Sequence, residues 1–196
     1  MASPASICRR FIASTRGLAA IEFALIMPVL LVLFLASFDA GNAIIIYMKV
    51  RSATFSLAAI TNQYNATNDT ISTSTMTTIT SGVAAVLAPY SSTPAIIVIS
   101  QIKSTSASQA VVSWSYSPTA GYALTQGAAY TALPANFAQN TCGGTYPCYS
   151  IFAQVSYTFT PSFGYFITGP LTMSDSLYVT PRSSVCVQYN GVPATC

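Results

Sequence analysis

Residues 16–36 read RGLAAIEFALIMPVLLVLFLA and form the only long run in the chain that is apolar and almost free of charge. The apolar run continues to Phe38, so that 21 residues extend from Leu18 to Phe38. At about 1.5 Å of rise per residue, a helix of this length is about 30 Å long, which matches the hydrocarbon thickness of a bilayer. The sequence therefore predicts one membrane-spanning helix near the N-terminus.

Glu22 is unusual for such a segment. A carboxylate inside a membrane helix costs on the order of a few kcal/mol. Two interpretations are open. Glu22 is either a boundary residue about 6 Å into the helix, where its cost is modest, or a residue whose function offsets that cost.

The segment before the apolar run is basic. It contains Arg9, Arg10 and Arg16, and the first 21 residues contain no acidic residue. Residues 1–17 therefore resemble a targeting leader, and the positive flank predicts a cytoplasmic N-terminus and a translocated C-terminus. The alternative is a secretory signal cut near residues 41–43. A run longer than the usual 7–15 residues that also contains Glu22 argues against that alternative.

The helix is expected to continue beyond the membrane. Apolar residues recur at spacings of three, four and seven, which is typical of an amphipathic helix with one buried face. We expect that face to contain Ile44, Tyr47, Met48, Phe55, Ala58 and Ala59, with Lys49, Arg51 and Ser52 largely on the other face. The pattern predicts one helix over residues 18–61.

The remaining residues, 62–196, predict an exported α+β domain. A short helix over 76–88 is followed by period-two segments at 95–103, 109–117, 151–160 and 171–181, which predict an antiparallel sheet. Val112, Trp114 and Tyr116 are expected on one face of their strand. A long loop over 118–149 and an aromatic segment over 161–170 connect the strands; Phe163, Tyr165 and Phe166 in the latter are either core residues or part of a binding surface. The expected organisation is thus a leader (1–17), a long helix (18–61) and a domain with a helix packed on a sheet (62–196).

Five cysteines divide between the two ends of the chain. Cys8 lies in the leader, and four lie in the exported part: Cys142, Cys148, Cys186 and Cys196. An even number of cysteines in an oxidising compartment predicts two disulfides, and four cysteines allow three connectivities. We favour Cys142–Cys148 and Cys186–Cys196 because both close short loops. Four free buried thiols are the alternative.

The composition argues against catalysis. The chain contains no histidine, which excludes Ser-His-Asp and Cys-His systems and all histidine metal sites. Only four residues are acidic, and no phosphate-binding glycine loop precedes a helix. We therefore expect no catalytic, cofactor-binding or metal-binding residues, no small-molecule substrate and no enzyme activity. The absence of a basic cluster beyond the leader argues against nucleic-acid binding.

One further pattern joins these features. A basic leader ends in Gly17, the apolar helix starts at Leu18, and a glutamate is the fifth residue after the glycine. This arrangement resembles the processing site of type IV pilins and pseudopilins. Residues 17–28, GLAAIEFALIMP, are similar to the TadE-like minor pseudopilins of tight-adherence (Tad) pili. Residues 157–161, YTFTP, and 169–174, GPLTMS, resemble the C-terminal part of that family.

The resemblance implies a structural role with defined partners. A prepilin peptidase would cut between Gly17 and Leu18, and Glu22 would pair with the freed N-terminal amine of a neighbouring subunit. Such an ion pair offsets desolvation only when both partners are present. The subunit would start in the bacterial inner membrane, with its domain periplasmic, and would join or prime a pilus used in adhesion. The major Tad pilins are much shorter and tend to have tyrosine where this chain has Phe23. The length of 196 residues favours a minor subunit. The alternative is an uncleaved single-span accessory protein of the same system.

Overall fold

The computed structural model describes residues 17–64, 70–134, 137–164 and 169–193. The chain divides into two compact units. The described part of the first unit comprises residues 17–42, 161–164 and 169, and the second contains the other described residues.

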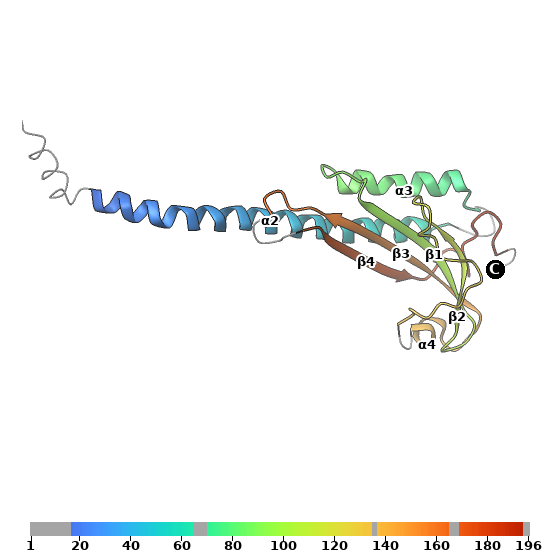
Figure 1. The fold of residues 1–196 in the computed structure, drawn as a ribbon. Coiled ribbons are helices and arrows are strands. Elements are labelled where there is room, and N and C mark those ends of the chain that lie inside the picture. The colour runs from blue at the N-terminus through green and yellow to red at the C-terminus, as the bar shows by residue number, and fades with distance from the viewer. Residues whose placement is uncertain (1–16, 65–69, 135–136, 165–168, 194–196) are drawn as a thin grey trace, which may run out of the picture. The chain divides into compact units, whose positions relative to one another are not determined.

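The first element is helix α2, Leu18–Thr61, which has 44 residues and runs through Pro28 without interruption (Figure 1). One continuous helix over these residues was predicted from the sequence and is confirmed. Its first 25 residues belong to the first unit and its last 19 to the second.

The sequence assigned the wrong face of α2 to the core for most of the residues it named, although Ala58 is buried as predicted. Ile44 is 61% exposed and Phe55 is 63% exposed, whereas the core takes residues on another face of the same helix. These buried residues are spaced by three or four positions: Ala43, Ile46, Val50, Ala53 and Leu57. Both faces of this half of α2 are rich in apolar residues, so periodicity alone predicts a helix but does not select the face that the sheet covers.

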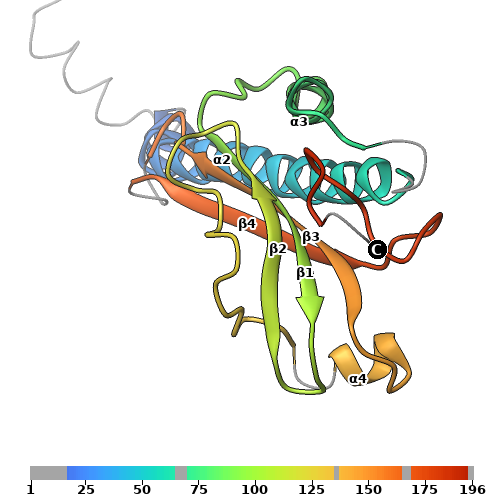
Figure 2. The ribbon, with the colours of Figure 1, turned by 90° about the vertical axis from the view of Figure 1, so that its right-hand side faces the viewer.

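Helix α3, Thr73–Leu87, begins three residues before the predicted start at residue 76. Ser72 caps its N-terminus by accepting a hydrogen bond from the Thr75 N–H, which satisfies one of the unpaired donors of the first turn. Its buried apolar residues are Met76, Ile79, Val83 and Leu87, at helical spacing. In the second unit, α3 and the C-terminal half of α2 lie on the same side of the sheet (Figure 2).

Four antiparallel strands form the sheet: β1, Ala95–Ser104; β2, Ala110–Tyr116; β3, Cys148–Phe159; and β4, Leu171–Val179. Their order is β2-β1-β3-β4, so the two longest strands, β1 and β3, lie at the centre. All four strands were predicted, although β3 begins three residues earlier than expected. The α+β fold class is confirmed.

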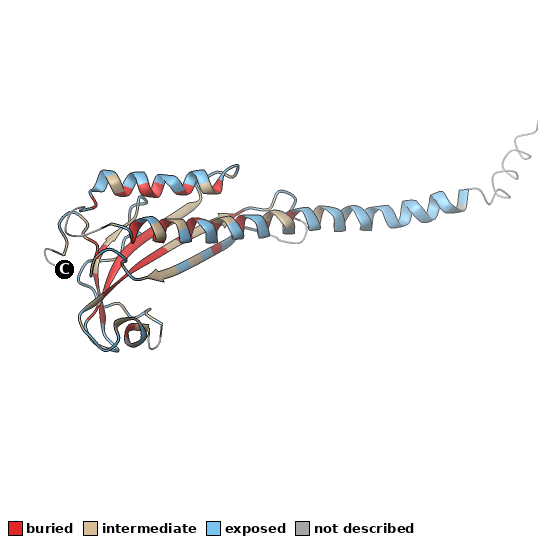
Figure 3. Ribbon diagram, turned by 180° about the vertical axis from the view of Figure 1, so that it is seen from behind, coloured by how far each residue is buried: buried red, intermediate tan, exposed pale blue. Residues whose placement is uncertain are grey.

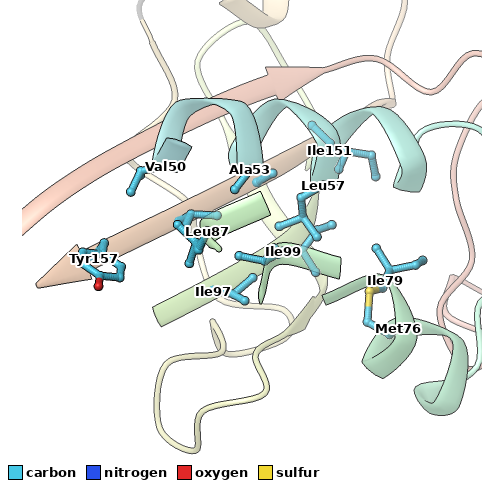
Figure 4. Packing of buried hydrophobic residues seen from close by; sticks show 14 of the residues in the cluster. Val50, Ala53, Leu57, Met76, Ile79, Leu87, Ile97, Ile99, Ile151 and Tyr157 are labelled. Carbon is cyan, nitrogen blue, oxygen red and sulfur yellow. The ribbon is translucent and has the colours of Figure 1, made fainter. Parts of the chain in front are cut away.

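The main core lies between the sheet and the two helices (Figure 4). Val50 and Leu57 of α2 pack there with Met76 of α3, Ile99 of β1 and Ile151 of β3. The predicted alternation of β3 is confirmed, because its odd-numbered residues all face this core: Ile151, Ala153, Val155, Tyr157 and Phe159.

Val112 does not share the face of Trp114 and Tyr116, so that prediction was wrong. A bulge pairs Gln101 with Trp114 but Ile102 with Val112, which leaves Ser113 as an extra residue. The extra residue reverses the side-chain alternation of β2. Val112 therefore packs in a second cluster on the other side of the sheet, which also contains Ile102, Ala110 and Phe152.

The predicted loop over residues 118–149 contains a short helix, α4, Phe137–Cys142. A Cys142–Cys148 disulfide joins the end of α4 to the start of β3, as predicted. Gly143 and Gly144 make the turn between them with φ of +57° and +83°, a region that favours glycine. Cys186 is fully buried and disulfide-bonded. Its predicted partner, Cys196, lies outside the described residues, as do Cys8, Tyr165 and Phe166.

The segment after β4 folds back onto the main core. The Val187 N–H donates to Gln101 Oε1 (2.7 Å), and Trp114 Nε1 donates to the Val187 carbonyl (2.8 Å). All three residues are at most 2% exposed. Gln101 and Trp114 thus satisfy the buried backbone of this segment.

Candidate functional site

The residues of the predicted processing site lie together at the N-terminus of α2. Gly17 is exposed and directly precedes the helix, and Leu18 is the first helical residue. Glu22 is exposed and lies one turn further along. Because four residues span about one helical turn, Glu22 lies about 6 Å along the axis from the backbone of Leu18. Residues 1–16, most of the predicted leader, lie outside the described residues.

The apolar span, residues 18–38, has no buried side chain among those described (Figure 3). Most of its large apolar side chains are 49–73% exposed, with Leu25 the most exposed. Glu22 is its only charged residue. It lies in the one helix of the described residues that is long and apolar enough to cross a membrane. A lipid bilayer or other apolar helices would satisfy such a surface.

Asp39 ends the apolar span and is held by the connection between β3 and β4. Asp39 is 2% exposed, and its carboxylate accepts hydrogen bonds from three consecutive backbone N–H groups, those of Ser162, Phe163 and Gly164. The four N···O distances lie between 3.1 and 3.4 Å. Backbone donors thus offset the cost of burying this charge. This role was not predicted from the sequence, although the position of a carboxylate directly after the apolar run was an available signal.

Beyond the span, α2 has an exposed apolar face in the second unit. We call Ile44, Met48 and Phe55 the outer face; they are 61%, 56% and 63% exposed, and their spacing of four and seven places them on one side of the helix. Other apolar residues exposed on this half are Ile45, Tyr47 and Ile60. Contiguous exposed apolar surface on a folded domain commonly marks an interaction site.

A groove of about 260 Å³ lies between α2 and α3 in the second unit. Its lining is largely apolar and includes Leu57 and Ile60 from α2 and Ile79 and Val83 from α3. Gly82 leaves open space at its wall, since a side chain there would meet nothing within 4 Å. The groove adds apolar surface on another side of α2 from the outer face.

Lys49 is half-buried and contacts the end of α3. Its Nζ donates to the carbonyls of Val86 (3.1 Å) and Ala88 (2.6 Å) at the C-terminal end of α3. A cation at this end satisfies carbonyls that have no partner within the helix and interacts favourably with the helix dipole. Lys49 thus ties the two helices together, a role that its position in the sequence did not reveal.

Two tyrosine hydroxyls form hydrogen bonds on the side of the sheet that carries the second cluster. Tyr130 and Tyr178 share a hydrogen bond of 2.6 Å between their hydroxyls, and Tyr178 also donates to the Ala132 carbonyl. Burial raises the pKa of both tyrosines above the usual value for tyrosine. Both are therefore neutral near pH 7 and hold the 118–134 segment against β4. Among the described residues, no three His, Cys, Asp or Glu side chains gather as a metal site would require.

A single N-terminal apolar helix followed by an α+β domain fits a membrane-anchored single-pass protein. The model of the TadE-like protein family matches residues 17–58, which is the stretch from the predicted cleavage site almost to the end of α2. This match confirms the resemblance drawn from residues 17–28. Searches of curated proteins and of solved structures gave no match.

Proposed function

We propose that this chain is a minor pilin subunit of a Tad-type pilus. In this proposal, a prepilin peptidase cuts between Gly17 and Leu18 while α2 spans the inner membrane with its C-terminal domain in the periplasm. The subunit then leaves the bilayer and packs α2 against other pilus subunits, or primes their assembly, in support of surface attachment. The role is structural and not enzymatic. The TadE-like match over residues 17–58 supports this assignment.

The observation that carries the proposal is the outer face. A simple anchor needs apolar surface only over the length that lies in lipid, which residues 18–38 already supply. Phe55 lies 17 residues beyond Phe38, about 25 Å further along the helix. Exposed apolar residues at that distance from the span are unfavourable in water and favour a protein partner. A subunit whose helix packs along a fibre would cover both stretches.

Glu22 fits the same role. In the proposed mature chain it is the fifth residue, one turn from the new amine at Leu18. An exposed carboxylate in an apolar helix is costly in lipid, and a neighbouring subunit's amine would offset that cost on assembly. We expect Glu22→Ala to leave membrane insertion intact and to reduce piliation. Glu22→Asp is the matched variant that keeps the charge, and normal piliation of Glu22→Ala would remove this role.

Mass spectrometry of the protein from its native membranes tests the processing step. We expect a mature N-terminus at Leu18, and a Gly17→Leu variant should accumulate with its leader attached. An intact leader in the wild-type protein, together with its absence from sheared pili, would instead favour an uncleaved accessory protein of the same system.

A further inference from the structure

The first unit presents two aromatic rings at the end of the apolar span. Phe38 is the last residue of the span, and Phe163 comes from the connection between β3 and β4. Their ring centroids are 5.7 Å apart in an edge-to-face arrangement. Both rings remain largely uncovered, at 51% and 45% exposed. An aromatic pair thus forms at the end of the span without being buried by the protein.

Asp39 fixes Phe163 in this position. The carboxylate binds the Phe163 N–H and the N–H groups on either side of it, at 3.1–3.4 Å. Gly164 closes the arrangement with φ of +65°, a conformation that lets successive N–H groups converge on one anion. Asp39 is 2% exposed, so the acceptor side of these part-buried bonds is shielded from water, which strengthens their hold on the segment.

The position of this pair along the helix matches the boundary of a bilayer. The 21 residues from Leu18 to Phe38 cover about 30 Å, so the hydrocarbon core ends close to Phe38. Aromatic side chains at that level are favoured in the headgroup layer, where Trp and Tyr are enriched and where Phe adds apolar contact. A carboxylate without partners would be costly at the edge of the hydrocarbon, whereas backbone donors stabilise that of Asp39.

We infer that residues 161–164 form a second, non-helical membrane contact, in which Asp39 holds Phe163 beside Phe38 so that both rings enter the headgroup layer of the bilayer. The occupant of this surface is therefore lipid. This inference rests on the proposed membrane anchoring through residues 18–38 and goes beyond it, because a single helix is all that anchoring requires. The sequence left open whether Phe163 is a core residue or part of a binding surface; in this inference it belongs to a lipid-binding surface.

Tryptophan fluorescence can test the contact in the full chain reconstituted into phosphatidylcholine and phosphatidylglycerol vesicles. The native Trp114 is 2% exposed and supplies a constant background. Three variants each add one tryptophan: Phe163→Trp at the proposed contact, Phe34→Trp within the span, and Tyr122→Trp at a site that is 48% exposed on the second unit. Quenching is measured with lipids that carry bromine on their acyl chains.

We expect the added tryptophans at positions 34 and 163 to be quenched at least about twofold more than the one at position 122. If position 34 is quenched but position 163 behaves like position 122, the lipid contact is wrong and the membrane anchor stands. If neither position 34 nor position 163 is quenched, both the anchor and the contact that depends on it are wrong.

A second pair of variants tests the part assigned to Asp39. In the Phe163→Trp background, Asp39→Ala should lower quenching to the level of position 122, and Asp39→Asn, which keeps one acceptor oxygen, should lie between. The near-UV circular dichroism of Trp114 in the single variants reports whether the domain stays folded. Undiminished quenching in both Asp39 variants would overturn the assigned role.

Discussion

The two halves of α2 are both apolar but meet different surroundings. In residues 18–38 no described side chain is buried, whereas in residues 43–61 a residue is buried at almost every turn. The second half has the sheet and α3 to pack against, and the first half has no such partner within its own unit except the connection at Asp39. Hydropathy therefore predicts that α2 is apolar throughout, but the presence of a facing sheet decides which residues become core.

The largest expected difference between the halves is in stability. Leu57 is 1% exposed and Leu30 is 53% exposed. Leu57→Ala should lower the free energy of unfolding of the domain by about 2–5 kcal/mol, because it leaves a cavity in the core. The matched Leu30→Ala should change it by less than about 0.5 kcal/mol. Denaturant unfolding of the detergent-solubilised protein measures both, and similar losses would contradict the division of α2.

The outer face provides the next test, because it is apolar, exposed and outside the span. Phe55→Ser should reduce incorporation into pili about tenfold, as expected when an interface residue worth about 1.4 kcal/mol is lost. The unfolding free energy should change little, since Phe55 is 63% exposed. Quantitative immunoblots of sheared pili measure incorporation.

Tyr122→Ser is the control for the outer face, because Tyr122 is an exposed aromatic residue on the side of the sheet opposite α2, where it lines a pocket with Gln154 and Ser156. It should be incorporated normally. Equal incorporation of the Phe55 and Tyr122 variants would mean that the outer face has no role in assembly.

A smaller loss of unfolding free energy should distinguish the hydrogen-bonded Lys49 from an ordinary surface charge in the second half of α2. Lys49→Met keeps the length of the side chain but removes the two bonds to Val86 and Ala88. The expected loss is about 1 kcal/mol of unfolding free energy, because water can replace part of this partly exposed contact. Arg51→Met, at an exposed position on the same helix, should change it by less than about 0.5 kcal/mol. Equal losses would show that Lys49 contributes only as a surface charge.

The sequence predicted the helices and strands better than it predicted the contacts between them. Helix α2, the four strands and the Cys142–Cys148 disulfide follow from length, period and spacing, all of which are local properties. Which face of α2 is buried depends on the position of the sheet, which is not a local property. The side of the sheet on which Val112 lies depends on pairing with β1, because a single bulge residue, Ser113, reverses it. Asp39 and Lys49 are single charges whose partners are backbone groups distant in sequence. The position of Asp39 directly after the apolar run was the only local signal for its role, and no local pattern indicated the role of Lys49.

Site-specific photo-cross-linking from position 55 tests most directly whether α2 packs against other subunits beyond the apolar span. A photoreactive phenylalanine analogue at position 55 replaces an exposed aromatic ring with one of similar shape, and the same analogue at position 122 is the control. In piliated cells we predict that position 55 gives an adduct with another pilus subunit in the sheared fibre and that position 122 does not. Absence of the subunit from pili, or a cross-linking pattern that is the same at both positions, would contradict this assembly role.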